Sequence, residues 1–162
     1  MKTIFFLIAG IISLASNAQV TKVSIQASGL TCSMCSNSIN KSLKTIDFVE
    51  NVNSNIKTSS FEITFKPGSK VDFDKLKKKV EDAGFTIANF VAAINFNNVQ
   101  VKENQPVKIG DKTFKFLNVK DITLNGTKQV RVVDKGFVSN KEFKKHAPAI
   151  TATGKGIYHL TI

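Results

Sequence analysis

The hydrophobic residues in the first half of the chain change their spacing in an order that few folds can accommodate. Over residues 20–27 apolar and polar side chains alternate, which predicts a half-buried β-strand. Beyond this segment the apolar residues Ile39, Leu43 and Ile46 are spaced four and three residues apart, as on one face of a helix. This half of the chain therefore opens with a strand that is followed by an amphipathic helix.

The same reasoning predicts three more strands and one more helix in this half. A weak alternating segment covers residues 49–56, and a clear one covers residues 61–65. A second helix is expected from Asp72, a good capping residue, to Gly84, a typical helix stop. Residues 87–94 then predict a last strand. The resulting order β-α-β-β-α-β is that of a ferredoxin-like α+β domain.

Residues 95–162 have a different pattern, in which six or so short alternating segments are separated by turn signals. Asn125-Gly126 is a strong hairpin signal, and only residues 141–146 indicate a short helix. This pattern predicts a small all-β domain, either a barrel or a sandwich. We therefore expect a domain of residues 19–94 and a second domain of residues 95–162, each able to fold by itself.

Residues 1–18 have the features of a secretory signal peptide. Lys2 supplies a positive charge, residues 4–14 are almost wholly apolar, and Ser16 and Ala18 suit cleavage by a signal peptidase. The apolar run of about 11 residues is shorter than the ~20 that span a bilayer, which favours cleavage over retention as an anchor. We expect an exported protein, periplasmic or secreted by a bacterium, without stable membrane insertion after cleavage.

The chain is strongly basic, with 23 Lys and Arg against 12 Asp and Glu and a formal net charge of +11. Such a charge raises the question of a nucleic-acid partner. However, nearly all of these cations are lysines dispersed along the sequence, whereas base recognition and bidentate phosphate binding prefer arginine. We expect solvated surface lysines and no nucleic-acid partner.

Two cysteines, Cys32 and Cys35, carry the chemistry of the chain. They form a Cys-x-x-Cys motif between the first predicted strand and the first predicted helix, with Cys32 in the loop and Cys35 in the first helical turn. Helix N-termini favour thiolate over thiol, and thiolates bind soft ions such as Cu(I). Structural zinc needs four ligands, but the two histidines, His146 and His159, are far away in the sequence.

The segment Gly29-Leu30-Thr31-Cys32-Ser33-Met34-Cys35, with the helix pattern after it and Gly84-Phe85 after the second helix, resembles the heavy-metal-associated domain. This family includes copper chaperones, the N-terminal domains of copper-transporting ATPases and periplasmic mercury-binding proteins. The resemblance covers roughly residues 20–94. It departs from the family at Asp47-Phe48-Val49, where a Gly before a Val is common.

The resemblance implies that Cys32 and Cys35 bind the metal ion. It also implies supporting roles around them: an apolar core plug for Leu30 and an aromatic residue packed beside the metal loop for Phe85. The remaining residues expected to shape or flank the loop are Gly29, Thr31 and Met34.

We expect an exported soft-metal-binding protein that captures, buffers or transfers its ion. Cu(I) is the favoured ion, and Hg(II), Zn(II) and Cd(II) are the alternatives; a metal-transporting or metal-accepting protein is the expected partner. Two other interpretations stay open: a thiol–disulfide redox protein that uses the same cysteine pair, and an adaptor that binds no metal. The sequence has neither a glycine-rich nucleotide loop nor a His-Glu-x-x-His motif, so we do not expect an enzyme.

Overall fold

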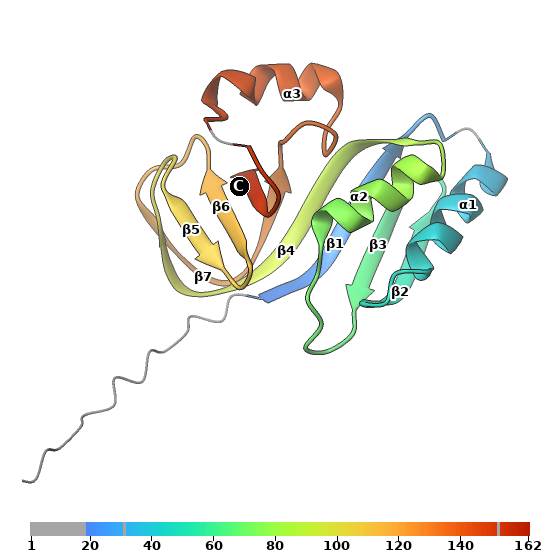
Figure 1. Ribbon diagram of the computed structural model, residues 1–162, viewed down its shortest axis with the longest axis horizontal. Helices are drawn as coiled ribbons and strands as arrows, with labels where there is room; N and C mark the ends of the chain where they lie inside the picture. Colours follow the sequence, from blue (N-terminus) through green and yellow to red (C-terminus); the bar gives the residue numbers. More distant parts are fainter. Residues whose placement is uncertain (1–18, 31, 152) are drawn as a thin grey trace, which may run out of the picture.

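A single eight-stranded sheet forms the frame of the molecule in a computed structural model (Figure 1). The structure describes residues 19–30, 32–151 and 153–162. The expected signal peptide, residues 1–18, and the loop residue Thr31 lie outside the described residues. The strand order across the sheet is β2-β3-β1-β4-β7-β8-β6-β5.

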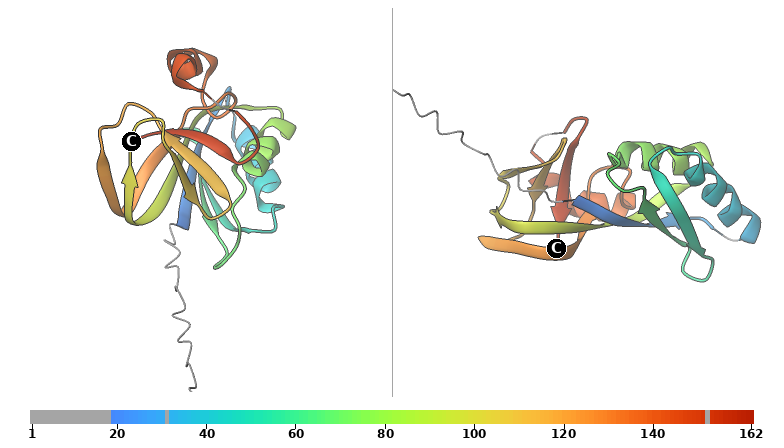
Figure 2. Two further views of the ribbon diagram at one scale, coloured as in Figure 1. Left: turned by 60° about the vertical axis from the view of Figure 1, so that its left-hand side comes forward. Right: turned by 90° about the horizontal axis from the view of Figure 1, so that it is seen from below.

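The first half of the chain has the predicted β-α-β-β-α-β order and the ferredoxin-like fold. Its strand β1 pairs antiparallel with both β3 and β4, and helices α1 and α2 lie on the same face of these strands (Figure 2). None of the helices in the described part of the chain is long and apolar enough to cross a membrane. The elements are β1 (Gln19–Ser28), α1 (Ser33–Lys44), β2 (Val49–Asn55), β3 (Ser60–Phe65), α2 (Phe73–Asp82) and β4 (Thr86–Val101).

The core of this half lies between the sheet and the two helices. Alternate residues of β1, such as Val23 and Ile25, are fully buried and stand opposite Ala92 and Phe90 of β4. The helices bury the side chains that the helical spacing predicts, namely Ile39, Leu43, Leu76 and Val80. Removing these apolar side chains from water stabilises the sheet and fixes which face the helices cover.

The second half of the chain extends the same sheet. Strands β6 and β8 pair in parallel, whereas β5 and β6, β4 and β7, and β7 and β8 pair antiparallel. The short helix expected near residues 141–146 is present. The elements are β5 (Pro106–Ile109), β6 (Lys112–Phe116), β7 (Ile122–Val132), α3 (Asn140–His146), the 3-10 turn Ala147–Ala149 and β8 (Ile157–Thr161).

Strand β4 joins the two halves, and here the structure differs from the sequence-based expectation. The boundary expected between Ile94 and Asn95 falls inside this strand, which pairs with β1 along one edge and with β7 along the other. No Gly or Pro interrupts residues 86–101, so nothing in the backbone ends the strand at residue 94. The two expected domains therefore share one sheet.

Asn125-Gly126 does not form the expected hairpin turn, because both residues lie inside β7. The partners Phe96–Gly126 and Val99–Leu124 leave two residues of β4 opposite one residue of β7. This two-against-one count defines a β-bulge. The bulge explains the error, because its glycine has a φ of 71°, a backbone conformation that hairpin turns also use.

The second half also packs against α2, through an aromatic cluster around Phe73. The Phe73 ring lies 5.0 Å from that of Phe90, 6.2 Å from that of Phe114 and 5.1 Å from that of Tyr158, measured between centroids. Such tilted ring pairs add to the stabilisation that burial provides. The cluster therefore joins α2, β4, β6 and β8 in one core.

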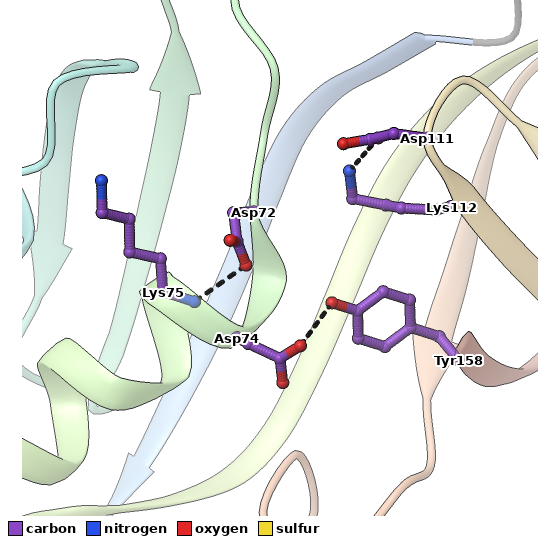
Figure 3. Close-up of polar contacts among 6 residues, drawn as sticks. All are labelled: Asp72, Asp74, Lys75, Asp111, Lys112 and Tyr158. Atoms are coloured by element: carbon purple, nitrogen blue, oxygen red, sulfur yellow. Dashed lines mark hydrogen bonds and ion pairs between the residues drawn. The ribbon is translucent and has the colours of Figure 1, made fainter. Parts of the chain in front are cut away.

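Polar contacts also lie at this junction (Figure 3). The Tyr158 hydroxyl donates a 2.9 Å hydrogen bond to Asp74 in the first turn of α2. The buried Lys112 ammonium lies 2.7 Å from Asp111 and 5.9 Å from the centre of the Phe73 ring. The bond from Tyr158 to Asp74 and the contact of Lys112 with Phe73 join the first turn of α2 to the second half of the chain.

Candidate metal site

The two cysteines lie where the loop after β1 enters α1, at one end of the sheet. Gly29 follows β1 with a φ of 78°, a left-handed conformation that L-residues with side chains adopt only at a cost. The chain then enters α1, whose N-cap residue is Cys32. The Cys32 sulfur accepts the backbone N–H of Cys35 at 3.3 Å, as a capping oxygen would. Cys35 lies in the first helical turn, as predicted.

The two sulfur atoms are close enough to act as one site. Cys32 Sγ and Cys35 Sγ are 2.6 Å apart, and both cysteines are free thiols. The Cys32 side chain is exposed, and that of Cys35 is half-buried. A thiophilic ion arriving from solvent can therefore reach both sulfurs without a change in the core.

The pKa values of the two thiols are shifted in opposite directions. The hydrogen bond from the Cys35 thiol lowers the pKa of Cys32, and the backbone N–H of Cys35 acts in the same direction. The same contact raises the pKa of Cys35, because the Cys32 sulfur holds its proton. Two groups coupled in this way lose their protons in two steps that belong to the pair. Within the pair, the contacts favour the thiolate on Cys32 and the proton on Cys35.

The residues expected to support the loop have different environments. Leu30 and Phe85 are half-buried and pack against the main core. Met34, in contrast, is 82% exposed and takes no part in the core. Gly29 supplies the turn, and the position of Thr31 lies outside the described residues.

The backbone around Phe85 explains how this side chain reaches the core beside α2. Gly84 N–H donates to Glu81 O at 2.9 Å and Phe85 N–H donates to Val80 O at 3.2 Å. Together with the φ of 88° at Gly84, these bonds form a Schellman motif, in which the helix ends and the next residue turns back toward it. The sequence signal for this motif is the Gly-Phe pair itself.

The two histidines do not join the cysteines. His146 faces Glu142 within α3, with 3.4 Å between Nε2 and Oε1. His159 is fully buried in β8, where its Nδ1 lies 2.7 Å from Asp134 Oδ1. Across residues 19–30, 32–151 and 153–162, no three His, Cys, Asp or Glu side chains are grouped so that they could hold a metal ion.

Sequence reasoning missed the contact between Asp134 and His159. Asp134 accepts the backbone N–H of His159 at 2.6 Å as well as facing its ring, and burial raises the pKa of this carboxyl group. The two residues are 25 positions apart, a spacing that matches no motif. Only the pairing of β7 with β8 brings them together.

The region that holds the cysteines is similar to domains of known proteins. Residues 24–86 match the family model of the heavy-metal-associated domain. The probable copper-exporting P-type ATPase of Archaeoglobus fulgidus is 31% identical over 84 residues, which are 52% of this chain and 10% of the relative. The copper-exporting P-type ATPase of Staphylococcus saprophyticus is 35% identical over 74 residues, which are 46% of this chain and 9% of the relative. The chain thus spans about a tenth of the length of these relatives.

Among solved structures, the yeast copper transporter domain Ccc2a is 28% identical. The match covers 41% of this chain and 90% of that domain, with a TM-score of 0.36.

Proposed function

We propose that the heavy-metal-associated domain at residues 24–86 binds one soft metal ion, Cu(I), between Cys32 and Cys35. The observation that carries this proposal is the pair of reduced thiols, 2.6 Å apart at the start of α1. The sulfur that caps the helix is the one on which the contacts favour a thiolate, so that a thiolate is available to an incoming ion. Binding of the ion would displace the remaining thiol proton.

The ligand set favours Cu(I). Two thiolates are soft ligands, and within the described ranges no further His, Asp or Glu side chain joins them to complete a larger ligand cluster. Structural zinc, in contrast, is bound by four ligands. The two curated relatives, both named as copper-exporting ATPases, support the same ion. Hg(II), Zn(II) and Cd(II) also bind thiolates, and competition between ions distinguishes them.

The exposure of the site favours transfer of the ion over permanent storage. Cys32 is exposed, and Met34 beside it is 82% exposed, so the sulfurs of another protein can approach the ion. Transfer would then proceed by exchange of thiolate ligands. We propose a metal-transporting or metal-accepting protein as the partner, and an exported location because of the sequence of residues 1–18.

The test is an anaerobic titration of the reduced full chain with Cu(I) against a competing chelator. We expect one ion per chain, with affinity lost when Cys32 and Cys35 are both replaced by Ser. Met34→Leu is the matched control, because it removes the neighbouring thioether sulfur but keeps an apolar side chain, and its affinity should match the unaltered protein. Unchanged stoichiometry and affinity in the double Ser variant would refute the proposal.

A second candidate function, thiol–disulfide exchange, rests on the same short distance. The sulfurs need to approach from 2.6 Å to about 2.05 Å, with loss of two protons and two electrons to an oxidant, to form a disulfide. An oxidising compartment outside the cytoplasm would favour that reaction. Acceleration of insulin disulfide reduction by the protein, with dithiothreitol as reductant, would support this function. Under the metal-binding proposal we expect no acceleration.

A further inference from the structure

We propose that Asn125 is a site of spontaneous covalent modification, at which the side-chain amide is lost and the residue becomes aspartate or isoaspartate. The chain contains a single Asn-Gly pair, Asn125-Gly126. Both residues are exposed, although they lie inside strand β7. The inference is independent of metal binding, since it concerns the opposite half of the sheet.

The geometry of the bulge brings the reacting groups together. Gly126 has a φ of 71°, and its backbone N–H donates to the Oδ1 of Asn125 at 3.1 Å. The side-chain amide thus already lies against the backbone nitrogen that must attack it. Gly126 has no side chain to obstruct this approach, and the space where a Cβ would stand is open to at least 4 Å.

The reaction needs only water and a base. The Gly126 nitrogen gives its proton to hydroxide and forms a bond to Cγ of Asn125, and the bond from Cγ to the amide nitrogen breaks. That nitrogen leaves as ammonia, having taken a proton from water, and a five-membered succinimide remains. Addition of water to one carbonyl of the ring gives aspartate, and addition to the other gives isoaspartate. No group is oxidised or reduced.

The surrounding strands can accept both products. Two residues of β4, Asn97 and Asn98, stand opposite Asn125 alone, so β7 is the shorter side of the bulge. Isoaspartate lengthens the main chain by one carbon on that shorter side, which we expect the ladder to tolerate. Each product also adds one negative charge to a chain with a formal net charge of +11.

The bulge is also far along the sheet from the cysteines. The bulge begins after Phe96 of β4, and the preceding residue Asn95 pairs with Gln19 at the start of β1. Cys32, in contrast, follows the end of β1. Figure 1 shows the start and the end of β1 at opposite ends of the sheet, along the direction of the strands. The modification should therefore leave binding of Cu(I) unchanged.

The experiment is incubation of the full chain at mildly alkaline pH, followed by proteolysis, peptide mass spectrometry and labelling with isoaspartyl methyltransferase. We expect the peptide with residue 125 to convert first, ahead of the peptide with exposed Asn53, which precedes Ser54 in β2. Asn125→Gln keeps a side-chain amide, but its cyclic intermediate would need a six-membered ring. In this variant the early gain of a negative charge and the labelling by isoaspartyl methyltransferase should disappear. Conversion of Asn53 while Asn125 stays intact, or an undiminished early gain of negative charge in Asn125→Gln, would overturn the proposal.

Discussion

The two cysteines of the loop have different chemistry although they share one motif. Cys32 occupies the N-cap of α1, where its sulfur accepts a hydrogen bond from the backbone N–H of Cys35, whereas Cys35 lies within the first turn of the helix. A helix N-terminus stabilises negative charge on a capping atom. The hydrogen bond between the two thiols lowers the pKa of Cys32 most, and the backbone N–H of Cys35 lowers it further.

We predict that Cys35→Ala raises the pKa of Cys32. The largest cause of its lowered pKa is the hydrogen bond from the Cys35 thiol, which Ala cannot make. Cys35→Ser is the matched control, because a hydroxyl keeps a donor at this position and should preserve part of the shift. The measurement is the pH dependence of Cys32 alkylation in the metal-free protein. Identical titration in the Ala and Ser variants would contradict this account.

Asp111 and Lys112 give a prediction for the pH dependence of stability. The hydrogen bond from Lys112 holds the pKa of Asp111 below its ordinary value. A lowered carboxyl pKa contributes stability above the ordinary value, and this contribution is lost as pH falls through the lowered one. We expect Asp111→Asn to reduce the free energy of unfolding at neutral pH by about 1 kcal/mol, because Asp111 is partly solvated.

Urea unfolding at neutral and acidic pH measures this effect. The difference between Asp111→Asn and the unaltered protein should shrink as Asp111 becomes protonated. Asp121→Asn is the control, because its pair with Lys102 is exposed on both sides and should contribute almost nothing. A deficit that is equally large at both pH values would show that Asp111 acts through packing and not through its charge.

At the level of single residues, sequence reasoning placed the two sulfurs together but did not find the buried contact of Asp134 with His159. Cys32 and Cys35 are three positions apart in a short motif, so local spacing is enough to place them together. The contact of Asp134 with His159, in contrast, depends on pairing between strands that are distant in the sequence. Local periodicity carries no information about such a contact.

At the level of elements, α2 is fixed by polar groups at both ends. Asp72 caps its N-terminus by accepting the backbone N–H of Lys75 at 3.0 Å. Its C-terminus ends in the Schellman motif at Gly84 that directs Phe85 back to the core. Caps of this kind make the helix boundaries predictable from sequence, since each needs a particular residue type.

Gly84→Ala should destabilise the protein by about 1 kcal/mol, because a side chain makes the left-handed conformation unfavourable. The cost is purely conformational, since no atom lies within 4 Å of the Cβ that would be added. Gly84→Asn should cost less, because Asn adopts this conformation more readily. Urea unfolding of the three proteins gives the order. If the Ala and Asn variants were as stable as the unaltered protein, Gly84 would not be needed for the turn.

Strand β4 shows where prediction of elements failed. Its alternation runs on past residue 94, but Asn97 and Asn98 interrupt the apolar pattern at the bulge. On the neighbouring strand, Asn125-Gly126 has the composition of a turn and the position of a bulge. Both features have the same backbone requirement, so composition alone does not separate them. The partner strand decides between them.

At the level of the whole molecule, the two halves share a strand and an aromatic core. A fragment of residues 19–94 would cut β4 and leave Phe73 and Phe90 without Phe114, Phe137 and Tyr158. Burial of each large aromatic side chain is worth about 1.5–3 kcal/mol. The structure thus leads us to expect that this fragment is much less stable than the full chain, in contrast to the expectation of independent domains.

We predict one cooperative unfolding transition for the full chain. Tyr158 is the single tyrosine and the sequence has no tryptophan, so tyrosine fluorescence reports on the second half at its junction with α2. The helical far-UV signal comes mainly from α1 and α2 in the first half. Both signals should change at the same urea concentration. Two separate midpoints would show that the halves unfold independently.

Tyr158→Phe tests the junction directly. The variant keeps the ring but loses the hydrogen bond to Asp74, so the far-UV midpoint should fall by an amount equivalent to about 1 kcal/mol. Thr161→Val is the comparison, because it alters the same strand away from the junction. Loss of stability in Tyr158→Phe together with a single transition would show that the stability of α2 depends on its contact with the second half. An unshifted helical midpoint would mean that this bond is dispensable.

The continuity of β4 also determines how the sulfur pair is presented to other molecules. A binding site carried on a flexible tether can rotate to meet an approaching surface, but here one unbroken strand and a common core link the two halves. A molecule that bound the second half would therefore hold the sulfur pair at a fixed distance and in a fixed orientation. Transfer of an ion to such a molecule would then depend on the direction from which it approaches the sulfur pair. The second half would fix that direction.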